Sequence, residues 1–411
     1  MLNPYIKARN LSDALKKHAF LRALYHLAGL ACAIISVLIC RHFTRVKKNK
    51  IVFDTFSGAY DCNPKYICEE ILRRGLPYEI VWVTGGESAN VESDASEFPH
   101  GVTLTKVYSH EFYKHLYSAH IIIDNNATIV SACYLPKRSQ RAINTWHGSL
   151  GIKRFPKKEG FVGLLEKFAS FQMGKTFDIA ISNSAFEDGY YRETYFKKTT
   201  IKRLGHARND LFFNNSPEFK EKIQSKVHSA LAIPPEKKIC LYGPTFRDNG
   251  SLLPYDLPYD KLLQALSKRF GGEWVILTRF HPRTKKMIEE LSFPEGVVSA
   301  SAYPDISELM YCADAGITDY SSWICEYIHT RRPGFLFATD IASYNSERGF
   351  YDPLDKMPFP LAKNSDELIE RILTFNEKEF LTDIDSFLKK KECIDDGHAS
   401  ERIVDLITGL I

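Results

Sequence analysis

Short apolar runs alternate with longer segments of helical spacing along most of this chain. In the first half, apolar runs fill much of residues 50–58, 78–86, 120–124 and 178–183, and each ends in small or polar residues. Runs of four to eight apolar residues that alternate with helices are typical of a parallel sheet covered by helices. We therefore predict an α/β unit of about seven strands before residue 205.

The strand pattern restarts near residue 236, after a polar stretch with helical spacing. The predicted strands lie in KKICLYGP, EWVILTRF, GVVSAS, AGITDYSS and PGFLFATD. Two consecutive α/β units predict two facing Rossmann-like domains, in which ligands bind beyond the carboxyl ends of the strands. The predicted boundaries are 1–49 for an N-terminal helical segment, 50–205 for the first domain, 206–235 for a linker, 236–390 for the second domain and 391–411 for a C-terminal helix.

The N-terminal segment differs from the rest of the chain in charge and hydropathy. The formal net charge is +4, yet residues 1–50 alone hold ten Lys and Arg against one acid, Asp13, around the uncharged run 27–40. That run is shorter than the ~20 apolar residues of a spanning helix. We predict a helix that lies in or dips into the anionic cytoplasmic leaflet of the cell membrane, as a peripheral or single N-terminal anchor. The alternative is an amphipathic helix packed on the protein.

The cysteine pattern and the missing nucleotide motifs narrow the function classes. Nine cysteines are scattered along the chain, and no Cys/His group has the spacing of a zinc site, which favours a reducing compartment. The sequence contains neither GxGxxG after a first strand nor GxxxxGK[ST], so neither dinucleotide binding nor a P-loop is indicated. We expect no metal, no cofactor and no nucleic-acid partner.

A Trp-His-Gly corner follows one predicted strand of the first domain. Trp146 and His147 come directly after the run AINT, and Lys153 and Arg154 follow shortly afterwards. Because the unperturbed pKa of histidine lies near neutrality, His147 is a candidate general base for an attacking hydroxyl. The alternative is a hydrogen-bonded corner histidine without a chemical role.

A second corner, TRFHPR, follows a strand of the second domain. His281 lies just before Pro282, a residue that fits the first turn of a helix, so His281 is expected near a helix N-terminus. A phosphate there would meet the imidazole, free N–H groups and Arg279. The alternative is a capped helix start with solvated arginines.

Two further corners carry side chains suited to anion binding. In TDYSSWICEYI, Ser321 or Ser322 is the expected N-cap of a helix, and Glu326 is placed to reach a ribose hydroxyl. In YGPTFRDNG, Thr245 and Arg247 lie at another strand end. A plain helix cap, a surface glutamate and a loop with a solvated arginine are the alternatives.

Six short motifs occur in an order that resembles the CDP-glycerol glycerophosphotransferases, the teichoic acid primases and polymerases: WHG, G-x-x-RND, PTFRD, RFHP, TDYSSxxxE and RGFYxD. The resemblance implies a GT-B fold, peripheral membrane attachment, and transfer of a polyol phosphate from a CDP-activated donor to a lipid-linked acceptor. By motif matching it implies His147 as the base. It also implies that His281, Ser321 and Ser322 hold the donor pyrophosphate. Glu326 would contact the nucleotide sugar.

The chain departs from the family pattern after WHG and before RND, on the predicted acceptor side, so glycerol and ribitol both stay open as the polyol. We predict that an acceptor hydroxyl, on a lipid-linked molecule or a glycan, attacks the β-phosphorus of CDP-glycerol or CDP-ribitol, in teichoic acid-like or capsular polymer synthesis. The alternatives are a GT-B glycosyltransferase with a nucleotide-sugar donor and a non-catalytic membrane scaffold. The predicted site residues are His147 and His281 for catalysis; Thr245, Arg247, Arg279, His281, Thr318, Asp319, Ser321, Ser322 and Glu326 for the donor; and Trp146, Lys153 and Arg154 for the acceptor.

Overall fold

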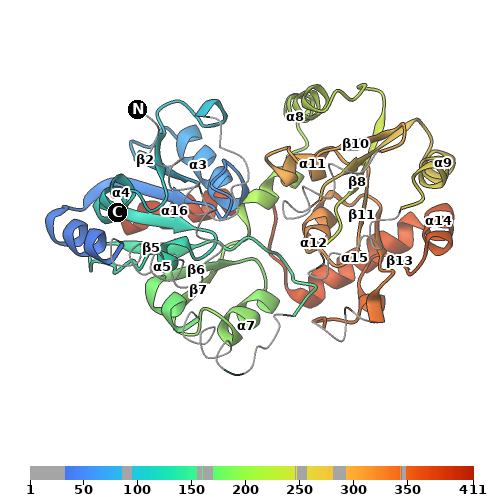
Figure 1. Cartoon of the computed structure of the whole chain (residues 1–411). Coiled ribbons are helices and arrows are strands. Elements are labelled where there is room, and N and C mark those ends of the chain that lie inside the picture. The colour runs from blue at the N-terminus through green and yellow to red at the C-terminus, as the bar shows by residue number, and fades with distance from the viewer. Residues whose placement is uncertain are drawn as a thin grey trace, which may run out of the picture.

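The computed structural model places two parallel sheets side by side, each covered by helices (Figure 1). The residues that it describes are 33–85, 95–154, 160, 170–245, 247, 257–280, 293–342, 344 and 349–411. The predicted α/β class with two Rossmann-like units is confirmed by this arrangement. The predicted membrane segment falls partly outside the described residues.

The first sheet contains seven strands in the order β3-β2-β1-β4-β5-β6-β7. Alternate residues of β1 point to opposite faces, so that Ile51 and Phe53 enter one apolar core and Val52 enters another. Both faces of the central strands are therefore covered, as the uninterrupted apolar runs predict. The elements are β1 (Lys47–Asp54), α3 (Cys62–Arg73), β2 (Glu79–Thr84), η1 (Ala95–Glu97), β3 (Thr103–Lys106), α4 (His110–Ser118), β4 (Ala119–Asp124), α5 (Thr128–Ser131), β5 (Arg141–Asn144), β6 (Ile179–Ser182), α7 (Ala185–Glu193) and β7 (Thr200–Arg203).

The second sheet contains six parallel strands in the order β10-β9-β8-β11-β12-β13. The two-residue strand β13 at its edge has no sequence signal of its own. The elements are β8 (Lys238–Tyr242), α9 (Tyr259–Phe270), β9 (Trp274–Thr278), β10 (Val297–Ser299), α11 (Ile306–Cys312), β11 (Ala315–Thr318), α12 (Trp323–Tyr327), η5 (Ile328–Thr330), β12 (Gly334–Phe337), η6 (Leu354–Lys356), β13 (Leu361–Ala362), α14 (Ser365–Leu373) and α15 (Glu377–Lys391).

The chain passes between the two domains twice. The first passage runs through η2 (Ala207–Phe213) to α8 (Pro217–Ala230), and the second runs from α15 to α16 (Ala399–Leu410). Figure 1 shows α16 among the elements of the first domain, and the ring of His120 on β4 lies 2.9 Å from the backbone oxygen of Leu410. The C-terminal helix therefore completes the first domain.

Buried ion pairs hold the domains against each other. Lys65 on α3 lies 2.7 Å from Asp305, which precedes α11, and 2.8 Å from Glu308 within α11. All three side chains are at most 7% exposed. Because removing one partner of a buried pair leaves an uncompensated charge, these pairs favour one arrangement of the two domains.

A helix at residues 33–43 lies on the first domain. Val37 and Cys40 are buried against it, whereas Ile35, Leu38 and Phe43 are 55%, 56% and 77% exposed. Within the described part of the chain, no helix has both the length and the apolar character that crossing a membrane requires.

Candidate active site

His147 lies in the loop after β5, at the carboxyl edge of the first sheet. Its Nδ1 atom is 2.7 Å from the backbone oxygen of Asn125. A carbonyl oxygen only accepts hydrogen bonds, so Nδ1 carries the proton and Nε2 keeps a lone pair. Among the described residues, none forms a hydrogen bond with Nε2. The ring stacks on Trp146, with the two centroids 4.7 Å apart.

The surroundings of His147 keep its imidazole neutral. Burial lowers the pKa of His147 to about 4, and the charge of Arg208 acts in the same direction. The bond to Asn125 opposes this shift without cancelling it. His147 is therefore in the form that accepts a proton at neutral pH, as a general base must be.

The backbone of this corner is bent and tightly held. Trp146 adopts a φ of +53°, in the left-handed region, which costs a non-glycine residue about 1–3 kcal/mol unless its surroundings enforce it. The side-chain amide of Asn63 donates to the backbone oxygens of Thr145 and Trp146, at 2.9 and 3.1 Å. A Cβ atom at Gly148 would lie 3.2 Å from the Trp146 indole nitrogen, so glycine leaves room for the ring.

Lys153 and Arg154, two of the predicted acceptor residues, contact the second domain. Lys153 forms an antiparallel bridge with Phe350, and the Arg154 N–H donates to the oxygen of Gly349 at 3.0 Å. The Arg154 guanidinium lies 5.9 Å from the centroid of the Tyr351 ring. The chain after WHG is thus paired with the GFY part of the RGFYxD motif. An acceptor role for these residues stays a prediction.

Arg247, predicted to bind the donor, is engaged by two carboxylates. Its guanidinium lies 2.7 Å from Asp319 and 2.7 Å from Asp340. The rings of Tyr320 and Tyr344 lie 5.0 and 5.1 Å from the guanidinium carbon. These contacts close the loop after β8 onto the ends of β11 and β12. Arg247 is 5% exposed, so its first role is to hold this loop.

The loop after β8 is fixed by further hydrogen bonds from predicted site residues. The Thr318 hydroxyl and the Trp323 indole both donate to the oxygen of Gly243, at 2.7 and 2.8 Å. The Thr245 N–H donates to the Asp319 carboxylate at 2.8 Å. Thr318 and Asp319 therefore hold the loop after β8 against the end of β11.

Ser322 occupies the N-cap position of α12, as one of the two predicted alternatives has it, but it does not cap the helix with a side-chain hydrogen bond. Its backbone is already helical, with φ −69° and ψ −13°, whereas a capping residue is normally extended. Both serines are half-buried, and their role in holding a pyrophosphate stays a prediction.

Arg279 follows β9 and donates hydrogen bonds to backbone carbonyl groups, while the charges of Asp305 and Asp61 also act on its guanidinium. Its Nη1 donates to the oxygens of Ala300, at 3.2 Å, and Tyr303. Burial lowers the pKa of Arg279, although a guanidinium remains charged in any case. His281, the second predicted catalytic residue, lies outside the described residues.

Glu326, predicted to reach a ribose, instead contacts the first passage between the domains. Its carboxylate is 2.6 Å from Nη2 of Arg208, and both side chains are at most 7% exposed. Burial raises the pKa of Glu326, and the neighbouring guanidinium opposes that rise. Nη1 of Arg208 also donates to the backbone oxygen of His147 at 3.0 Å. The corner that carries His147 and the corner that carries Glu326 are therefore connected through one arginine.

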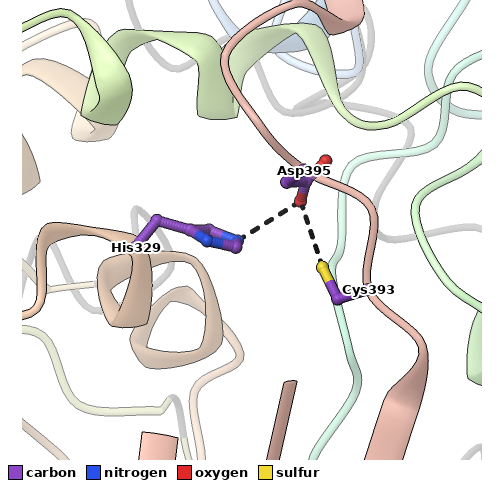
Figure 2. Close-up of side chains that lie close together, drawn as sticks. All are labelled: His329, Cys393 and Asp395. Atoms are coloured by element: carbon purple, nitrogen blue, oxygen red, sulfur yellow. Dashed lines mark hydrogen bonds and ion pairs between the residues drawn. The ribbon is translucent and has the colours of Figure 1, made fainter. Parts of the chain in front are cut away.

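A polar cluster occupies the second passage between the domains. Figure 2 shows His329 and Cys393 pointing toward Asp395, at 3.3 and 3.7 Å. These three groups lie close enough to hold a metal ion, a possibility that the sequence does not predict. The same Asp395 oxygen already accepts bonds from the amides of Asn183 and Asn209, both at 2.8 Å. Burial alone would raise the pKa of Asp395, but the neighbouring His329 imidazole holds it well below its usual range.

Sequence reasoning missed the partners that organise these corners. Asn63 is marked only by its position before Pro64, and Asp340 belongs to no predicted motif. Arg208 lies in the G-x-x-RND motif but has no predicted role. The G-x-x-RND motif was the signal that could have drawn attention to Arg208. Its burial then requires partners, because arginine is rarely buried unless it is paired.

Two Rossmann-like domains, with polar corners at the carboxyl ends of their strands, define a GT-B-like fold. The family model for CDP-glycerol:poly(glycerophosphate) glycerophosphotransferase matches residues 36–409. This chain therefore belongs to that family.

Relatives and solved structures are similar over most of the chain. The teichoic acid poly(glycerol phosphate) polymerase of Staphylococcus epidermidis is 30% identical over 385 residues, which cover 88% of this chain and 51% of that protein. The corresponding Bacillus subtilis polymerase is 28% identical, covering 88% and 49%. The teichoic acid glycerol-phosphate transferase of Staphylococcus aureus is 26% identical, covering 88% and 93%. The chain thus spans about half the length of the first two relatives.

Structures of the wall teichoic acid polymerase TagF share this fold. One matches with a TM-score of 0.77 and 26% identity, covering 95% of this chain and 97% of that chain. A TagF variant soaked with CDPG matches with a TM-score of 0.78 at the same identity and coverage.

Proposed function

We propose that this protein transfers a polyol phosphate from a CDP-activated donor to a hydroxyl of a lipid-linked or glycan acceptor. Glycerol phosphate is the leading candidate for the transferred group. The observation that carries the proposal is His147, whose Nδ1 proton is held by Asn125 so that Nε2 is available as a base. Membership of the glycerophosphotransferase family supports the same chemistry.

The reaction needs one proton acceptor and a site for a diphosphate. His147 takes the proton of the acceptor hydroxyl, whose oxygen then attacks the β-phosphorus of the donor. The bond between this phosphorus and the CMP oxygen breaks, and CMP leaves. Phosphoryl transfer depends chiefly on positioning and on stabilisation of charge. Arg279, and His281 by the resemblance, are the groups proposed to stabilise the phosphates.

Incubation of the full chain with alternative donors and a membrane extract tests the proposal. CDP-glycerol, CDP-ribitol, UDP-sugars and CMP-sugars are supplied separately, and CMP, UDP and the modified acceptor are quantified. We expect CMP together with a phosphodiester-linked polyol on the acceptor. Turnover of a nucleotide sugar alone would assign a glycosyltransferase instead. No turnover of any donor would favour a scaffold.

We also propose that the helix at 33–43 lies on the cytoplasmic face of an anionic membrane. Ile34, Ile35, Leu38, Ile39 and Phe43 are all more than 40% exposed. Such an apolar face is unfavourable in water. Exposed Arg41 lies on the same helix, and exposed Arg45 follows it. An apolar face with adjacent cations suits the interface of an anionic bilayer.

Sedimentation with vesicles that contain phosphatidylglycerol tests this attachment. Leu38→Gln together with Phe43→Gln is expected to move most of the protein to the supernatant, at unchanged melting temperature. Leu72→Gln is the matched control, because Leu72 is 40% exposed on α3 and belongs to a different surface. Equal sedimentation of all three proteins would contradict the attachment.

A further inference from the structure

One buried guanidinium contacts both the WHG corner of the first domain and α12 of the second domain. Arg208 is 5% exposed and belongs to η2, in the first passage between the domains. Its Nη1 donates to the backbone oxygen of His147 at 3.0 Å and to the Cys62 sulfur at 2.8 Å. Its Nη2 reaches Glu326 of the second domain at 2.6 Å. Arg208 therefore bridges the first domain, the linker and the second domain.

The arginine completes a set of bonds that fixes the backbone around the base. Asn63 holds the oxygens of Thr145 and Trp146, and Arg208 holds the oxygen of His147. The two holding residues are themselves connected, because the Arg208 N–H donates to the Asn63 amide oxygen at 3.1 Å. The carbonyl oxygens of three consecutive residues thus accept hydrogen bonds, and the middle residue, Trp146, is the one in the left-handed region.

We propose that Arg208 is a positioning residue for the transfer reaction, which aligns His147 with the donor domain by holding the His147 carbonyl and the Glu326 carboxylate at once. The proposal rests on the proposed function for the identity of the reaction. It adds a residue to which neither the motifs nor the comparisons give a role.

The geometry of these contacts requires arginine rather than a generic cation. A planar guanidinium donates in several fixed directions, whereas a lysine ammonium is a compact point charge on a flexible stem. Arg208→Lys therefore keeps the charge near His147 but cannot reach both domains with the same geometry. Misplacing a reacting group by about 1 Å is enough to lower a rate about 100-fold.

The first experiment compares kinetic constants of Arg208→Lys and Arg203→Lys. We expect Arg208→Lys to lower kcat about 10- to 100-fold while the donor KM changes less than about threefold, because positioning acts on the reacting geometry. Arg203 is the matched control, since its guanidinium also contacts two carboxylates, Asp188 at 2.6 Å and Glu392 at 3.2 Å, but its side chain is 31% exposed. Wild-type kcat in Arg208→Lys, or a change confined to KM, would overturn the proposal.

A double-mutant cycle of Arg208→Lys and His147→Asn distinguishes positioning of His147 by Arg208 from an independent structural or binding role of Arg208. If Arg208 acts through His147, Arg208→Lys has little further effect once His147→Asn has removed the base. Multiplicative losses would refute the proposal. Should Arg208→Lys fail to fold, Glu326→Gln serves in the same cycle, because it removes the charge that Arg208 meets in the second domain and leaves the guanidinium itself unchanged.

A measurement without turnover keeps this proposal separate from the proposed function. NMR titration of ¹³C-labelled histidine reports the pKa of His147 in the wild type, in Arg208→Lys and in Arg208→Gln. Loss of the nearby positive charge is expected to raise the His147 pKa in Arg208→Gln, while Arg208→Lys stays closer to the wild type. Identical titrations in all three proteins would show that Arg208 does not act on His147, even if no donor were turned over.

Discussion

The WHG corner of the first domain and the Arg247 corner of the second domain use their polar groups in opposite ways. At the WHG corner, hydrogen bonds hold the backbone, and Nε2 of His147 has no partner among the described residues. At the other corner, the charged side chain itself is enclosed, because Arg247 meets both Asp319 and Asp340. The first corner thus leaves an imidazole nitrogen without a protein partner among the described residues, whereas the second balances its positive charge with carboxylates of the protein.

This difference separates two kinds of residue that share the same motifs. A residue whose functional atom has no protein partner is available to substrate. A residue whose charge is balanced within the protein builds the loop in which other groups act. Arg247 and Glu326 belong to the second kind in this structure, although the sequence places both at the donor. The comparison therefore predicts loss of activity at the first corner and loss of stability at the second.

The largest effect is expected at His147. His147→Asn keeps a side chain that can donate to the Asn125 oxygen but removes the base. Loss of a general base typically costs about 100- to 10,000-fold in rate, so kcat/KM for the CDP-polyol should fall within that range. The melting temperature should change little. Activity of the variant within about tenfold of the wild type would assign the proton transfer to another group.

Arg247→Met is expected to act on folding instead. The substitution leaves two carboxylates without their cation, and breaking a buried pair from one side costs about 3–5 kcal/mol. Urea unfolding followed by circular dichroism measures this loss. Arg371→Met is the control, because Arg371 lies exposed on α14 of the same domain. An unchanged unfolding midpoint together with a raised donor KM would move Arg247 to the substrate-binding kind.

The sheets were predictable because their signal is local. The run at 121–123 is three consecutive isoleucines in a strand covered on both faces, and such a run has few other solutions. The placement of His147 after β5 and of Thr318 at the end of β11 follows from the same pattern. The two-residue strand β13 and the return of α16 to the first domain depend on tertiary packing, which no short window of sequence contains.

The pairings within the site were not predictable for a related reason. Arg208 and Glu326 are 118 positions apart, and Arg247 and Asp340 are 93 apart. A single sequence shows that a charged residue is present, but not which opposite charge it meets. The motifs therefore placed the WHG and TDYSS corners next to strand ends, as the structure has them, whereas the division into partnerless and enclosed side chains required the fold.

Two adjacent carboxylates in the second passage between the domains allow the same comparison of an enclosed side chain with an exposed one. Asp395 is enclosed by donors, whereas the Asp396 side chain is 52% exposed and pairs with Arg402. Asp395→Asn replaces one carboxylate oxygen, an acceptor, by an amide NH2 that faces N–H donors, and should lower the free energy of unfolding by about 2–3 kcal/mol. Asp396→Asn should cost less than about 1 kcal/mol, as surface pairs do. Equal unfolding midpoints of the two variants in urea would show that the enclosed Asp395 stabilises the fold no more than the exposed Asp396.

The smallest effect concerns the acid side of the pH profile. The pKa of His147 is lowered to about 4, so the base form persists below the ordinary histidine range. At pH 5.5, a base of this pKa is more than about nine-tenths unprotonated, whereas one near 6.5 is only about one-tenth unprotonated. The acid limb of kcat/KM should therefore lie near pH 4 to 5. The sign for stability is the same, because the unfolded state binds more protons than the folded state between about pH 4 and 6.5, so that stability falls with falling pH in that window. Initial rates that fall to half near pH 6.5 would mean that the base has the pKa of an exposed histidine. That result would contradict the assignment of buried His147 as the base.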